Sequence, residues 1–95
     1  MIKRFVKLSV DPAKLAEFKA NFAIAKPQIL SVSGCRHLEL LQVTDEPNLF
    51  FTFSIWDSEH HLEEYKNTTI YFRAWETVKP LLNAEPLAWS TKHAG

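Results

Sequence analysis

Arg4 is the first residue of this 95-residue chain whose type and position could do chemistry. It is a cation that alternates with Ile2, Val6 and Leu8 on one face of a predicted strand. A guanidinium in apolar surroundings needs a partner, because burying an unpaired charge is very unfavourable. Arg4 could therefore hold an anionic or carbonyl oxygen of a ligand. The alternative is a structural ion pair across a sheet, with Glu39 as one candidate partner.

Histidines and the single cysteine form a second group of candidates. His37 and Glu39 are two residues apart on a predicted strand, so they should share a face with Cys35. The Glu39 carboxylate would raise the pKa of His37, which could tune the histidine as a general base. The alternative is an ordinary solvated or interface strand face. His60 and Glu64 are four apart on a helix, but no third ligand accompanies them, so we predict no metal site. Cys35 is interpreted as an unreactive, buried thiol.

Aromatic side chains form the third group, and it is the largest. A predicted strand ends at Trp56, and the helical segment after it adds four more aromatic residues: Tyr65, Tyr71, Phe72 and Trp75. These rings, with the amide of Asn21, could line a pocket for a flat apolar ligand between a sheet and its helices. They could equally form an ordinary hydrophobic core.

Several function classes are excluded by composition and motifs. Eleven basic residues balance eleven acidic ones without a basic cluster, so nucleic acid and anionic membranes are not expected partners. The phosphate-binding, dinucleotide, serine-hydrolase and zinc-protease signatures are absent, and we predict no cofactor. The lone cysteine and the lack of an apolar run of about 20 residues predict a cytoplasmic protein.

Periodicity predicts the elements that position these residues. Residues 2–10 alternate as a strand; Asp11-Pro12 reads as a helix start, and Leu15, Phe18, Phe22, Ala25 and Ile29 follow at helical spacing. Pro27 should kink or split this helix. Residues 35–43 and 49–56 are predicted to form a β-hairpin. A helix capped by Asp57 or Ser58 should follow and continue to about residue 79, with a break near residues 67–68. Residues 86–91 are predicted to form a last strand.

The resulting order, β-α-β-β-α-β, predicts a single α+β domain over residues 1–95 with the ferredoxin-like arrangement. Both helices should cover one face of a four-stranded antiparallel sheet. The strand at 49–56 has apolar residues on both faces, so the second face would be an exposed patch in an isolated chain. We therefore predict a homodimer in which the two sheets face each other.

The chain resembles the antibiotic biosynthesis monooxygenase (ABM) domain family of the dimeric α/β-barrel superfamily. The resemblance rests on Gly34-Cys35 before a strand, the run from Phe50 to Trp56, Ser58-Glu59 and Leu62, and the later residues Phe72, Trp75 and Pro80-Leu81-Leu82. Family members that oxidise fused-ring phenols without a cofactor use an Asn upstream of a strand-end Trp and a Tyr in the following helix. Trp56 matches that Trp, whereas Thr52 stands at the Asn position and Leu62 at the Tyr position. The resemblance implies no haem ligand here, because Trp75 falls near the position of the haem-degrading branch's axial His.

The leading hypothesis is a cofactor-independent monooxygenase of a small aromatic or quinol-like substrate. Trp56, Trp75, Tyr71, Phe72, Asn21 and Thr52 would form the substrate site. Arg4 or His37 would stabilise a developing enolate, and Tyr65 or Tyr71 would bind a phenolic oxygen. Two alternatives stay open: a non-catalytic dimer that binds a small apolar molecule, and an isomerase or decarboxylase with His37 as its base.

Overall fold

The computed structural model describes residues 1–95 and contains one four-stranded antiparallel sheet. Its strands are β1 (Ile2–Ser9), β2 (Cys35–Val43), β3 (Glu46–Trp56) and β4 (Leu87–Thr91). They lie in the order β2-β3-β1-β4, so the first and third strands are central. Alternation of side chains along β1 and β3 produces the two distinct faces of this sheet.

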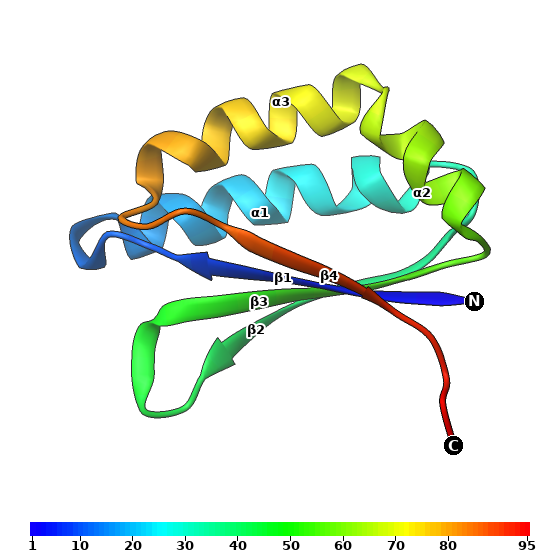
Figure 1. Cartoon of the computed structure of the whole chain (residues 1–95). Helices are drawn as coiled ribbons and strands as arrows, with labels where there is room; N and C mark the ends of the chain where they lie inside the picture. The colour runs from blue at the N-terminus through cyan, green and yellow to red at the C-terminus, as the bar shows by residue number, and fades with distance from the viewer.

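Three α-helices lie between the strands in the chain. The helix α1 (Leu15–Leu30) comes after β1, and α2 (Glu59–Lys66) and α3 (Thr69–Val78) come after β3. Short 3₁₀ turns at Pro12–Lys14 and Lys79–Leu81 join α1 and α3 to their strands. Figure 1 shows α1 and α3 side by side on one face of the sheet, with α2 at one end. The predicted ferredoxin-like α+β fold is thus confirmed, with helices on one face. None of the helices combines the length and apolar character needed to cross a membrane.

The helix boundaries follow from local hydrogen bonding. Asp11 Oδ1 accepts from the Ala13 amide at 3.0 Å, and Ser58 Oγ accepts from the His61 amide at 3.2 Å. Thr68 does the same for Tyr71 at 3.2 Å and starts α3 after the break at residues 67–68. Polar side chains that satisfy free amides of the first turn are typical helix N-caps. The predicted break in this helical segment is confirmed.

Pro27 does not split α1, which runs uninterrupted to Leu30. The helix was predicted to kink or split at Pro27, and the split does not occur because the proline lies in the last turn, where only one backbone hydrogen bond is lost and few residues follow. Gly34 then reverses the chain with φ of +87°, the left-handed region that glycine tolerates. His61 packs directly against Gly34, so this turn lies against the start of α2.

The core lies between the helices and one face of the sheet. Even-numbered side chains of β1 and β3 point into it, and they form two neighbouring clusters, one around Phe18 and Phe50 and one around Trp56 and Leu62. Phe18, Phe50 and Trp56 are almost fully buried. The strand β3 is therefore buried on its helix side.

The opposite sheet face carries apolar residues with no covering layer. Cross-strand pairs place Phe5 beside Phe53 and Trp89, and Leu41 beside Phe51. The Phe5 and Phe53 rings stack at 5.0 Å, and Trp89 is 48% exposed. An exposed apolar surface of this kind marks an interaction site more often than a solvated face.

Candidate functional site

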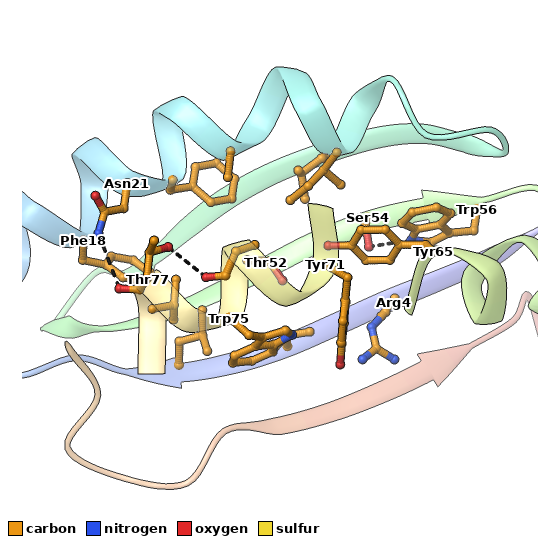
Figure 2. A pocket seen from close by; sticks show the side chains of 18 residues that line it. Arg4, Phe18, Asn21, Thr52, Ser54, Trp56, Tyr65, Tyr71, Trp75 and Thr77 are labelled. Atoms are coloured by element: carbon orange, nitrogen blue, oxygen red, sulfur yellow. Dashed lines mark hydrogen bonds between the residues drawn. The ribbon is translucent and has the colours of Figure 1, made fainter. Parts of the chain in front are cut away.

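A cavity of about 90 Å³ lies between the sheet and helices α1 and α3. Side chains from all three α-helices and from β1, β2 and β3 line it, and most of them are apolar. Figure 2 shows the labelled polar and aromatic side chains of its wall. A concave apolar site with a few polar groups is the usual form of a small-molecule pocket. Of the candidate residues, the cavity brings together Arg4, Asn21, Thr52, Trp56, Tyr65, Tyr71 and Trp75.

Trp56 and Tyr65 form the innermost aromatic wall. Their rings stack at 4.8 Å with an interplanar angle of 27°, and both side chains are buried. The indole Nε1–H of Trp56 donates to Ser54 Oγ at 3.0 Å (Figure 2). Ser54 is therefore the acceptor that the buried indole requires. Its position two residues before Trp56 on the same strand face was visible in the sequence, but we did not predict this role.

The Tyr65 hydroxyl is held in its neutral form. Burial raises the pKa of this phenol well above its ordinary value; Tyr71 and Cys35 add to the rise, and Arg4 opposes it. A neutral phenol is a hydrogen-bond donor as well as an acceptor. Tyr65 can therefore donate to a ligand oxygen at neutral pH, but it does not supply a phenolate base.

Tyr71 and Trp75 continue the wall on α3. Tyr71 meets Tyr65 edge-to-face at 5.2 Å and Trp75 at 6.3 Å. The joint between α2 and α3 positions them, because Thr68 donates to the Tyr65 carbonyl at 2.7 Å while capping α3 at Tyr71. Residues 71, 74, 75 and 78 form the inward stripe of α3.

Arg4 lies at the β1 side of the cavity and is half-buried. Its cross-strand neighbours are Ser54 on β3 and Ser90 on β4. The proposed ion pair with Glu39 does not form, because Glu39 points to the other sheet face and contacts His37 Nε2 at 3.4 Å. The guanidinium is therefore free to meet a ligand.

Asn21 and Thr52 are polar edges of the cavity. The Asn21 side chain donates to the Thr77 carbonyl at 3.5 Å, which links α1 to α3 (Figure 2). A second, outer groove between the same helices shares four residues with the cavity: Asn21, Ala25, Ala74 and Thr77. These residues therefore form a thin wall between the two spaces.

His37 and Phe72 do not reach the cavity, so both are removed from the predicted site. His37 lies opposite Ile55, on the sheet face turned away from the helices, 5.6 Å from the Phe53 ring. Phe72 is 55% exposed, because its neighbour Tyr71 takes the inward position on α3. Without His37 the isomerase or decarboxylase hypothesis has no base at this site.

Cys35 and His37 were expected on one face, but an irregular register in β2 separates them. Cys35 packs against the cluster that contains Trp56, on the helix side. A bulge adds a residue on one strand, which inverts the alternation beyond it. Burial raises the pKa of the Cys35 thiol, which agrees with an unreactive cysteine. His60 and Glu64 form a simple pair at 2.7 Å on an exposed helix face.

Comparisons with known proteins agree with this architecture. The sequence profile of the antibiotic biosynthesis monooxygenase family matches residues 1–77. The chain belongs to the antibiotic biosynthesis monooxygenase family. No protein of curated function matches it. In this ABM chain, Trp56 is in the cavity wall, whereas Leu62 is buried in the core and does not line the cavity.

Solved structures with low sequence identity share the ABM fold. A protein from Nitrosomonas europaea, named as a proposed antibiotic biosynthesis monooxygenase, superposes with a TM-score of 0.90 at 20% identity, covering 98% of each chain. A conserved protein from Methanosarcina mazei Go1 gives 0.93 at 18% identity, covering 98% of this chain and 92% of that one. A proposed family member from Caulobacter crescentus CB15 gives 0.91 at 21% identity, covering 99% and 90%. At these identities the likeness establishes the fold.

Proposed function

We propose that this chain is a cytoplasmic, cofactor-independent monooxygenase of a small aromatic or quinol-like substrate, bound in the cavity between sheet and helices. The observation that carries the proposal is the stacked pair Trp56 and Tyr65, whose aromatic wall continues through Tyr71 and Trp75 beside the Arg4 guanidinium. Aromatic walls bind a flat ring by offset or edge contacts. A nearby cation stabilises the anion that forms when a phenol loses its proton.

The reaction balances with dioxygen as the only co-reactant. The phenolic proton leaves for solvent, and the electron-rich ring anion transfers an electron to dioxygen. Recombination forms a carbon–oxygen bond, and the resulting peroxide breaks as a ring hydrogen is lost. One oxygen atom becomes a new carbonyl, and the other leaves in water. Arg4 would favour the first step by lowering the pKa of the bound phenol, and Tyr65 would donate to its oxygen.

Tyr65 supports this proposal despite the departures from the family pattern. Leu62 stands where the cofactor-free oxygenases have Tyr, but Tyr65 lies one helical turn later and stacks on Trp56 at 4.8 Å. A phenol hydroxyl is therefore available at the same tryptophan. Thr52 lines the cavity at the position of the family's Asn and offers a hydroxyl in its place.

Oxygen uptake with a panel of hydroquinones, followed by mass spectrometry after reaction in ¹⁸O₂, tests the proposal. We expect consumption above the buffer rate and one labelled atom in the quinone product. Trp75→Ala should lower the rate by about tenfold or more through loss of ring contacts. Phe72→Ala is the matched control, because Phe72 is aromatic, on the same helix and outside the cavity.

A non-catalytic binding protein is the second candidate, and one observation favours it. The cavity contains no histidine or carboxylate that could take the phenolic proton, and burial keeps Tyr65 protonated by raising its pKa. Tight binding of the hydroquinones without oxygen consumption would decide for this alternative and against the monooxygenase.

We also propose that two copies associate through the uncovered sheet face. Phe5, Phe51, Phe53 and Trp89 supply the apolar surface. His37 and Glu39 would lie in this interface rather than at the site. The same face carries Lys3 and Lys7, whose long stems can cover apolar surface while their charges stay at the rim.

A further inference from the structure

Arg4 is the only side chain of the cavity wall that carries a full charge at neutral pH, and it has no partner within the chain. Four carboxylates pair with other groups: Asp57 with Arg36, Glu39 with His37, Glu63 with Lys66 and Glu64 with His60. No aspartate or glutamate lines the cavity. The fold therefore leaves a half-buried cation whose counter-charge has to come from outside.

The position of Arg4 in the sheet keeps its head group accessible. Both cross-strand neighbours of Arg4 are serines, Ser54 and Ser90, so the two adjacent strands place no large side chain beside it. Figure 2 shows the Arg4 side chain rising from β1 among the labelled polar and aromatic groups of the wall. A planar guanidinium presents a fork of N–H donors that matches a carboxylate in bidentate geometry.

The other polar groups nearby are donors as well. Ser54 already accepts from Trp56 with its oxygen, so its hydroxyl hydrogen remains to be donated. Tyr65 keeps its proton at neutral pH. A set of donors with one positive charge and no acidic acceptor favours a ligand that is rich in acceptors and negatively charged, and the apolar wall strengthens that attraction by excluding water.

We propose that the cavity takes a small aromatic carboxylate, whose ring lies against Tyr65, Tyr71 and Trp75 and whose carboxylate accepts from Arg4. The inference rests on the proposed function only in taking this cavity as the ligand site. It narrows the substrate class to aromatic acids, and it makes Arg4 the residue that determines specificity for the acid.

Isothermal titration calorimetry with three probes tests the inference: benzoate, the neutral benzamide and acetate. At pH 7 the benzoate carboxyl is ionised. We expect benzoate to bind roughly ten- to a hundredfold more tightly than benzamide, the factor that charge-assisted hydrogen bonds provide. Acetate lacks the ring and should bind more weakly than benzoate by a similar factor.

Two Arg→Met variants, each of which removes one positive charge, distinguish a specific contact with Arg4 from a general electrostatic effect. Arg4→Met should remove the preference, so that benzoate and benzamide bind about equally, and the benzamide binding that remains reports a folded site. Arg73→Met removes a positive charge from the outer groove and should keep the preference. Equal affinity for benzoate and benzamide in the unmodified protein, or an unchanged preference in Arg4→Met, would overturn the inference.

The outcome is distinguishable from that of the proposed function. Benzoate preference without oxygen uptake, tested with 2,5-dihydroxybenzoate beside hydroquinone, would support the acid site and refute the monooxygenase. Uptake with hydroquinone and none with 2,5-dihydroxybenzoate would support the monooxygenase and overturn the acid site.

Discussion

Ser54 is a small residue on which the orientation of the buried Trp56 indole depends. Its hydroxyl is the only partner of the Trp56 indole N–H, and both side chains are at most 5% exposed. A hydroxyl–indole pair of this kind matters because its removal leaves a buried donor unsatisfied. The pair therefore stabilises the fold and sets the ring plane against which Tyr65 stacks.

Ser54→Ala should lower the free energy of unfolding by roughly 1–3 kcal/mol, the cost of an unsatisfied buried donor. Urea denaturation followed by circular dichroism measures it. Ser90→Ala is the control, because Ser90 is exposed and also faces Arg4 across the sheet. Equal effects of the two substitutions would show that the indole does not depend on Ser54.

Because of Tyr65, the free energy of unfolding should change with pH in the alkaline range. Its pKa is raised in the folded chain by burial first of all, so the folded state holds this proton more tightly than the unfolded state. The contribution is complete below the unfolded pKa of about 10, and it is lost as the pH rises through the folded pKa. We expect the free energy of unfolding to fall above about pH 10, and Tyr65→Phe to reduce that slope. Identical pH profiles for the two proteins would contradict this cause.

At the scale of elements, the turn between α1 and β2 depends on Gly34. The residue has φ of +87°, and a Cβ there would collide with the ring of His61 on α2. Gly34→Ala should cost roughly 1–3 kcal/mol from the backbone alone, with the collision in addition. Thermal denaturation measures the loss, and Gly95→Ala is the control, since nothing lies near that residue. A Gly34→Ala, His61→Ala double variant should recover the part due to the collision but not the backbone part.

The elements were predictable from the sequence because each has a clear period or cap. Alternation identified β1, and capping residues identified the starts of the helices. The faces were harder to predict. One irregularity in β2 placed Cys35 and His37 on opposite sides, and a single helical step of about 100° placed Tyr71 inward and Phe72 outward. The approach of Tyr65 to Trp56, which creates the candidate site, depends on packing between α2 and β3 and has no signal in the local sequence.

At the scale of the whole molecule, the helices cover only one of the two faces of the sheet. One face of the sheet β2-β3-β1-β4 lies under α1 and α3 (Figure 1). The other face carries the exposed side chains of Leu41, Leu87 and Trp89. Short chains bury a small fraction of their surface, so an apolar face of this size favours association. The proposed dimer would supply the missing layer.

Light scattering after size exclusion should give twice the 11.0 kDa mass of the chain. Phe51→Glu should give the monomer, because a carboxylate on this face resists burial while Lys7, its cross-strand neighbour, can pair with it in an isolated chain. Gln28→Glu adds the same charge on exposed α1 and should remain dimeric. A monomeric unmodified protein would refute the dimer.

The thin wall between cavity and outer groove has a consequence for kinetics. Ala25 and Ala74 offer little bulk there, and a single 3.5 Å hydrogen bond from Asn21 to Thr77 joins the helices. Separation of α1 from α3 would open a path for ligands without disturbing the sheet. Stopped-flow mixing should then show slower benzoate entry and exit in Ala74→Leu and faster exchange in Asn21→Ala. The contact between two helices would then set how long a ligand stays, whereas Arg4 and the aromatic wall would set which ligand binds.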